Sequence, residues 1–142
     1  MTQPSDAPLK LIALDAEDLA VLSAHLQDTT LKVRDLVYLP GERRFAFVGD
    51  RLNRLCDPTS RRRAAAHFDR VTAVRARGVD RTTPDAELEL LVVAFTPKEE
   101  PSGVIELHFA GGACLQLEVE CVEAQAADLG PATPAALPSI KD

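Results

Sequence analysis

The chain of 142 residues contains no tryptophan, one tyrosine and five phenylalanines. Proteins that bind single-stranded nucleic acid stack bases on exposed aromatic side chains, and this chain has very few to offer. Its core must therefore be built mainly from leucine, valine and alanine. The apolar fraction of 46% and the charged fraction of 27% are those of an ordinary globular protein, and the length fits one domain.

Long apolar runs are also missing. The longest, "LLVVAF" at residues 90–95, is far too short to cross a bilayer. The first ten residues, "MTQPSDAPLK", lack the basic cluster and the apolar stretch of a signal peptide. Cys56, Cys114 and Cys121 show no CxxC spacing, which favours reduced thiols. We therefore expect a cytoplasmic protein with no membrane partner.

The first third of the chain predicts a strand, a helix and a hairpin. Residues 9–14 alternate like a strand, and leucines at helical spacing predict a helix over 16–27 with Asp15 as its N-cap. A hairpin over 29–48 follows around the turn "PGERR". Its expected register puts four apolar residues on one face, with Val37 opposite Phe47 and Leu39 opposite Phe45.

Residues 68–77 and 86–96 read as two further strands. An antiparallel register that sets Arg75 opposite Glu89 and Arg77 opposite Glu87 also matches apolar residues on both faces. We therefore predict that these two strands pair with each other. Since strict alternation leaves apolar residues on both faces of 86–96, both faces need covering, and a second copy or another protein would complete the cover.

The segment "IELHFAGGACLQLEVE", residues 105–120, predicts a hairpin that turns at Gly111-Gly112, where positive φ angles are needed. No G-x-G-x-x-G or GK[ST] pattern is present and the next element is a strand, so this is not a phosphate loop. The preferred register pairs apolar residues and sets two acids opposite each other: Phe109 with Leu115, Leu107 with Leu117, Ile105 with Val119, and Glu106 with Glu118.

These elements indicate one α+β domain over 9–130. It is mainly an antiparallel sheet of six or seven strands, with a short helix near each end of the chain, the second over "ECVEAQAADLG" before Gly130-Pro131. Residues 1–8 form a flexible N-terminus and 131–142 a proline-rich tail. The sheet either curls into a roll resembling a pleckstrin-homology barrel or stays open with a helix on one face.

Nothing in the sequence forms a convincing catalytic constellation. None of the five serines lies in a G-x-S-x-G context. Cys114 and His108 share a face of the last hairpin, but such a pair is far more often structural than catalytic. The same pair with Glu106 or Glu118 has the donor types of a zinc site without paired ligand spacing. We therefore predict no catalytic residue, no metal and no cofactor, and favour a protein that is not an enzyme.

Positive charge is concentrated in one segment. Residues 50–81 hold nine of the twelve arginines and four aspartates, a net of +5, in a chain whose formal charge is −6. Residues 49–64 have no clean period and read as a long loop. Arginine forks bind phosphate and carboxylate bidentately. The candidate ligand-binding residues are therefore the arginines of this loop that have no obvious internal partner: Arg51, Arg54, Arg61, Arg62 and Arg63.

The function that these observations favour is a non-enzymatic binding or protein-interaction module. Its partner would be a second copy, another protein or a small anion. The alternative is an anion-binding enzyme or sensor that uses the arginines of 51–63 on a phosphate or carboxylate. RNA binding ranks last, because the whole chain is acidic and Phe68 is the only aromatic residue in the basic segment.

Several stretches resemble a bacterial family, domain of unknown function (DUF) family 2948. They cover most of residues 9–131: "LKLIALDAEDLAVLSAHLQD", "GERRFAFVGDRLNR", "FDRVTAVRARG", "ELELLVVAF" and "IELHFAGGACLQLEVECVEAQAADLGP". The resemblance implies a cytoplasmic protein of proteobacterial type. After "LNR" this chain has Leu55-Cys56-Asp57, where relatives are expected to carry an aromatic and acidic pair. The family has no established function, so no functional residue is carried over.

Overall fold

The computed structural model describes residues 8–52 and 61–131, and within them one α-helix and ten strands. The predicted class, a mainly antiparallel sheet with helix, is confirmed, but the strands outnumber the six or seven expected. In chain order the elements are β1 (Lys10–Ala13), α1 (Ala16–Leu26), β2 (Thr30–Lys32), β3 (Leu36–Leu39), β4 (Arg44–Leu52), β5 (Arg61–Phe68), β6 (Val71–Arg77), β7 (Glu87–Pro97), β8 (Gly103–Phe109), β9 (Cys114–Val119) and β10 (Ala124–Pro131).

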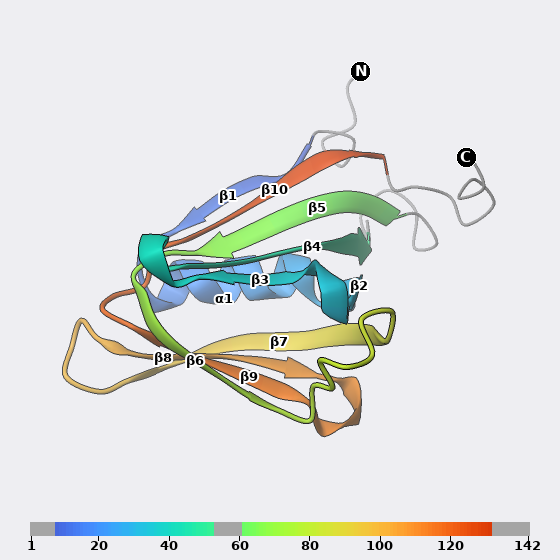
Figure 1. Cartoon of the computed structure of the whole chain (residues 1–142). Helices are drawn as coiled ribbons and strands as arrows, with labels where there is room; N and C mark the ends of the chain where they lie inside the picture. The colour runs from blue at the N-terminus through green and yellow to red at the C-terminus, as the bar shows by residue number, and fades with distance from the viewer. Residues whose placement is uncertain (1–7, 53–60, 132–142) are drawn as a thin grey trace, which may run out of the picture.

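The strands form one antiparallel sheet in the order β1-β10-β5-β4-β2-β7-β8-β9-β6, with β3 paired to β4 beside this path. The sheet folds over into two layers (Figure 1), with β1, β10, β5 and β4 in one layer and β7, β8, β9 and β6 in the other. Short β2 joins the layers because it pairs with both β4 and β7. The sheet does not close, so of the two predicted forms the barrel is wrong.

Helix α1 lies between the two layers (Figure 1) and confirms the helix predicted over 16–27. Asp15 is its N-cap, with Oδ1 accepting a hydrogen bond from the backbone N–H of Asp18 at 2.8 Å. Leu19, Leu22 and Leu26 are fully buried against the sheet. The apolar stripe that predicted the helix is therefore the face that fills one side of the space between the layers.

The predicted pairing of 68–77 with 86–96 is wrong. Strand β6 pairs with β9, and β7 pairs with β8 and β2. Arg75 forms its ion pair with Glu118, at 3.0 Å from Nη1 to Oε2, instead of with Glu89. The acid at position 118 complements Arg75 as well as the acid at position 89 does, so charge matching alone could not select the partner strand.

A β-bulge in β7 explains its apolar residues. The register shifts between Leu90 and Val92, so the alternation reverses and the side chains of Leu90 and Val93 both face the core. Leu88 and Phe95 pack against the same core, while Leu91 and Val92 are about 40% exposed. One face of β7 is thus apolar along most of its length, and the strict alternation expected for this strand is wrong; a partner that covers the exposed Leu91 and Val92 stays a prediction.

The hairpin predicted over 29–48 is present with three differences. A 3₁₀ turn at Val33–Asp35 splits its first strand into β2 and β3. The register of β3 is offset by one residue from the prediction, with Leu36 opposite Phe47 and Tyr38 opposite Phe45, so Val37 and Leu39 are exposed. Its second strand, β4, also runs on to Leu52, into the segment predicted as a loop, and β5 begins at Arg61.

The last hairpin turns at Gly111 and Gly112, whose φ angles are +88° and +93°, as predicted. Its register differs by two residues from the preferred one, and Leu107 lies opposite Leu115 and Ile105 opposite Leu117. A two-residue shift keeps every side chain on its predicted face.

The predicted second helix is wrong, because residues 124–131 form β10, which pairs with β1 and β5. Ala124 and Ala126 are fully buried there, in a strand that α1 contacts. The prediction of a flexible N-terminus over 1–8 falls almost entirely on residues outside the described part, 1–7, as does most of the proline-rich tail, 132–142.

Candidate functional site

Arg51, the first candidate ligand binder, lies inside the protein. It occupies an inward-facing position of β4, and its side chain is 7% exposed. Its guanidinium donates two hydrogen bonds to Asp128 of β10, from Nε to Oδ1 at 2.7 Å and from Nη2 to Oδ2 at 2.8 Å. Oδ2 also accepts the backbone N–H of Leu9 at 2.7 Å. Asp128 is therefore the internal partner that sequence reasoning did not find for Arg51.

The other arginines of the group also take part in the fold where they are described. Arg61 donates from Nη1 to the backbone oxygens of Asp28 and Asp50, at 2.9 and 3.0 Å. Arg63 pairs with the Asp50 carboxylate, 3.2 Å from Nη1 to Oδ1. Arg62 sits between them on β5, and Arg54 lies outside the described residues. An anion site on these residues stays a prediction, and it would compete with internal bonds of Arg51, Arg61 and Arg63.

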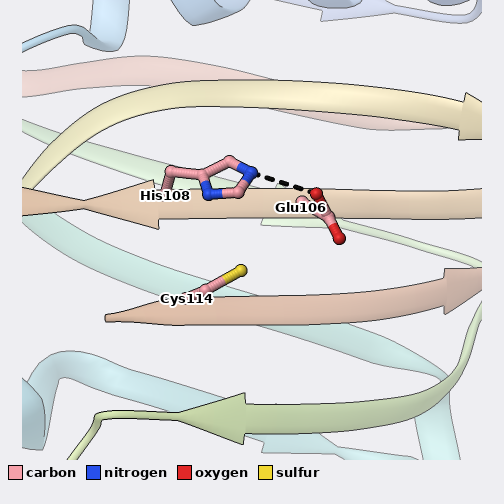
Figure 2. Close-up of side chains that lie close together, drawn as sticks. All are labelled: Glu106, His108 and Cys114. Atoms are coloured by element: carbon pink, nitrogen blue, oxygen red, sulfur yellow. Dashed lines mark hydrogen bonds and ion pairs between the residues drawn. The ribbon is translucent and has the colours of Figure 1, made fainter. Parts of the chain in front are cut away.

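The outer face of the β8–β9 hairpin holds a compact polar cluster of Glu106, His108 and Cys114 (Figure 2). His108 and Cys114 are directly opposite each other across the hairpin, and Glu106 is two residues from His108 on β8. The His108 Nε2 and Glu106 Oε1 atoms are 3.0 Å apart. Figure 2 shows the Cys114 sulfur pointing from β9 toward this pair. We call these three residues the hairpin cluster.

Neighbouring side chains hold the hairpin cluster in place. Gln116 donates from Nε2 to Glu106 Oε2 at 2.7 Å, since the register puts Gln116, and not Glu118, opposite Glu106. The expected repulsion between two facing acids is thereby avoided. Hydrogen bonds from Gln116 and then His108 hold the pKa of Glu106 below its ordinary value. Burial, and then the nearby charge of Glu106, raise the pKa of the Cys114 thiol.

This arrangement does not suit nucleophilic catalysis by Cys114. The side chain is 2% exposed, and its raised pKa keeps the thiol protonated at neutral pH. His108 pairs with Glu106 rather than with the sulfur. A reactive cysteine needs a lowered pKa and a base that bonds to it, and Cys114 shows neither feature; the expectation that the Cys114–His108 pair is not catalytic stays a prediction.

A second candidate site is an opening between β3 of one layer and β6 of the other. Neither strand is paired on its free edge within the described part of the chain, since β3 pairs with β4 and β6 with β9. Backbone hydrogen bonds close both ends of the gap, from Val71 N to Arg43 O and from Arg34 N to Pro84 O, each at 2.9 Å. We call the opening the β3–β6 cleft.

The β3–β6 cleft has a volume of about 330 Å³. This is within the range of roughly 300–1,000 Å³ that small-molecule sites occupy. Its lining is mostly apolar, contains two arginines and one tyrosine, and includes no acidic side chain: Val33, Arg34, Leu36, Tyr38, Phe45, Val74, Ala76, Val79, Arg81, Pro84 and Leu115. Sequence reasoning missed this site, because its walls come from four strands, a 3₁₀ turn and a loop that are spread along the chain.

Within the residues that the structure describes, no helix is both long and apolar enough to span a membrane. The chain matches no curated protein and no solved structure. Residues 9–139 match the family described as "Protein of unknown function (DUF2948)". This span is nearly the whole chain and includes the β3–β6 cleft and the hairpin cluster, so the protein belongs to the DUF2948 family.

Proposed function

We propose that this protein is a non-enzymatic binding module whose ligand is a small organic acid with an apolar body, held in the β3–β6 cleft. The observation that carries the proposal is an apolar opening between two unpaired strand edges, lined by two guanidinium groups and no carboxylate. The apolar body would lie on the floor of the cleft, and the acid group would face its arginines.

The residues at the floor of the cleft are the evidence that the ligand has an apolar body. Phe45 and Leu115 are almost fully buried, and Leu36 and Val74 from the two facing strands pack against the core. A volume of 330 Å³ equals that of about eleven water molecules at roughly 30 Å³ each, so a ligand of about ten non-hydrogen atoms is the right size. Water expelled from such a surface is the general driving force for binding an apolar body.

The polar side chains at the rim of the cleft are the evidence that the ligand carries an acid group. Arg81 is exposed and has no ion-pair partner among the described residues, whereas Arg34 pairs with Asp85. The Tyr38 hydroxyl makes no hydrogen bond within the described part of the chain, so it can donate one to a bound ligand. A carboxylate matches the fork of Arg81 bidentately. Arg81 is therefore the residue expected to select acids over neutral ligands.

Thermal unfolding in a series of linear and aromatic carboxylates, each compared with the alcohol of the same carbon skeleton, tests the proposal. A ligand at ten times its Kd adds about 1.4 kcal/mol, which raises Tm by roughly 4–6 °C in a chain of this size. We expect this shift for acids whose apolar body fills the cleft, a smaller one for their alcohols, and none for acetate.

Two variants tie such a shift to the cleft. Ala76→Leu fills the cleft from β6 and should abolish the stabilisation. Arg81→Gln should make the rise in Tm with each acid no larger than the rise with its alcohol. Arg75→Gln is the matched control, because Arg75 lies on the opposite face of the same strand. If no carboxylate stabilises the protein, or if the shift survives Ala76→Leu, the proposal is wrong.

The same screen separates this proposal from the arginine site predicted from the sequence. Inorganic phosphate and nucleotides are too polar for the floor of the cleft and would act through Arg61 and Arg63. Stabilisation by phosphate that is insensitive to Ala76→Leu and lost with Arg63→Gln would favour that alternative.

A further inference from the structure

We propose that Glu106, His108 and Cys114 form a zinc-binding site on the outer face of the β8–β9 hairpin. One donor atom from each residue lies within 4.8 Å of the other two. Thiolate, imidazole and carboxylate are the three side-chain donors that zinc takes in proteins. This site is separate from the β3–β6 cleft, and neither proposal depends on the other.

The hairpin holds the three donors close to the spacing that a metal requires. Bond lengths of about 2.0–2.3 Å around a tetrahedral zinc ion put its ligand atoms roughly 3.3–3.8 Å apart. The His108–Glu106 distance of 3.0 Å is already at this scale, and no pair exceeds 4.8 Å. Side-chain rotations that move the donors by about 1 Å would complete the set, with the two paired strands unchanged.

Gln116 provides the outer support that metal ligands generally need. It holds Glu106 through Oε2, which leaves Oε1, the oxygen now bonded to His108, to turn to the metal. A small cavity of about 80 Å³ lies beside Cys114 and is lined by Arg75, Arg77 and Gln116. At roughly 30 Å³ per water it has room for two or three molecules, so water can fill the fourth position.

The charges also fit a divalent ion. On binding, the Cys114 thiol gives its proton to solvent, and the thiolate and the Glu106 carboxylate together neutralise Zn²⁺. Arg77, which lies opposite Cys114 across β6 and β9, then faces a neutral set of ligands instead of a bare cation. A thiolate donor selects zinc over magnesium or calcium, which require oxygen ligands. The sequence offers these donor types without paired ligand spacing, because the ligands come from two strands.

The test is a titration of the full, untagged chain with Co²⁺ after removal of metals by a chelator. Cobalt bound by a thiolate gives an intense charge-transfer absorption in the near ultraviolet, and Zn²⁺ should abolish it by displacing one cobalt per chain. Cys114→Ser should remove the band, and His108→Ala should weaken zinc binding by more than the roughly 10–100-fold that losing an outer-shell partner costs.

Matched controls separate the hairpin cluster from other thiols and imidazoles. Cys121→Ser, Cys56→Ser and His25→Ala should each keep the band and the affinity. Tm of each variant without metal shows whether it folds, and Cys114→Ser is nearly the same size as the native residue. If the native chain gives no band, or if the band survives Cys114→Ser, the inference is wrong.

Discussion

At the scale of single residues, Arg51 and Asp128 show how a feature of the sequence that resembles a binding site can belong to the fold. The pair links β4 to β10 across the intervening β5, and the two side chains are 7% and 1% exposed. Both carboxylate oxygens and two guanidinium nitrogens are used. Buried charges of this kind are tolerated because each is hydrogen-bonded to a partner of opposite charge.

Replacing one member of this pair should be costly. We expect Asp128→Asn to lower the free energy of unfolding by about 3–5 kcal/mol at pH 7, because it leaves the Arg51 charge buried without a counter-charge. Urea denaturation measures the loss. The control is Glu120→Gln, which breaks the exposed pair with Arg43 and should cost less than about 1 kcal/mol. Equal effects of the two substitutions would show that the Arg51–Asp128 pair is dispensable.

The same pair predicts a dependence on pH. Burial acts to raise the pKa of Asp128, but the hydrogen bonds from Arg51 and Leu9, together with the positive charges of Arg51 and Arg62, outweigh it and hold the pKa below its ordinary 3.8. A lowered folded-state pKa gives stability that is fully present above 3.8 and is lost as the pH falls through the folded value. The difference in unfolding free energy between the native chain and Asp128→Asn should therefore shrink as urea titrations move from pH 7 to below pH 3.8. A constant difference would contradict this.

At the scale of elements, the sequence predicted local structure much better than pairing. The capped helix α1, the turn at Gly111 and the face of each residue in β8 and β9 were all predictable, because period and turn chemistry are local. The partner of β6 was not, since Glu89 and Glu118 complement Arg75 equally well. The β7 bulge inverts a strand's alternation without any signal from glycine or proline, and sheet contacts outweigh the helix propensity of the alanines in β10.

The start of β8 depends on a glycine at position 103. A Cβ added there would lie 2.6 Å from the Phe95 ring and closer still to the Thr96 carbonyl oxygen. We expect Gly103→Ala to destabilise the protein by about 1–3 kcal/mol in urea denaturation, because β7 or the ring would have to move. Gly41→Ala is the matched control, as nothing lies within 4 Å of its added Cβ. If the Gly103→Ala protein is as stable as the control, β7 or the Phe95 ring can move at little cost in free energy.

The contact between α1 and β7 depends on one hydroxyl. The Ser23 side chain is buried, and its Oγ accepts the backbone N–H of Val93, just past the bulge, at 2.8 Å. Ser23→Ala would leave that donor buried without a partner, and we expect a loss of about 1–3 kcal/mol. Thermal unfolding measures this loss of stability. The control is Ser102→Ala, which removes a hydroxyl whose hydrogen bond is exposed. A loss no larger than in Ser102→Ala would mean that another acceptor replaces Ser23.

At the scale of the whole molecule, both candidate sites depend on strand arrangement, the hairpin cluster on two consecutive strands and the β3–β6 cleft on segments far apart in the chain. Cys114 and His108 could be placed on one face from the sequence, but their direct opposition required the true register of β8 and β9. The β3–β6 cleft could not be predicted at all, because it exists only where one edge of β3 and one edge of β6 remain unpaired after the sheet folds over. Sequence patterns report which face of a strand is apolar, whereas a cleft depends on which edges stay open.

The distribution of charge over the whole molecule gives the last prediction. In the described part of the chain seven arginines pair with carboxylates, and the formal charge of the protein is −6. Four of these seven, Arg51, Arg63, Arg70 and Arg75, belong to the basic segment of residues 50–81, so the protein's own acids neutralise part of the charge that could suggest a nucleic-acid partner. Non-specific binding to nucleic acid requires cations that are free to displace counterions. We therefore expect no saturable binding of nucleic acid by this protein.

Fluorescence anisotropy of labelled single-stranded RNA, measured at about 50 and 200 mM salt, checks this expectation. A protein with six to ten free phosphate contacts would lose roughly 10³–10⁵ in affinity between these two conditions. We expect the anisotropy of the labelled RNA to stay at its protein-free value when this protein is added, at both salt concentrations. Saturable binding at low salt that disappears at high salt would show that the arginines exchange their internal partners for phosphate, and would return Arg61, Arg62 and Arg63 to the centre of the functional question.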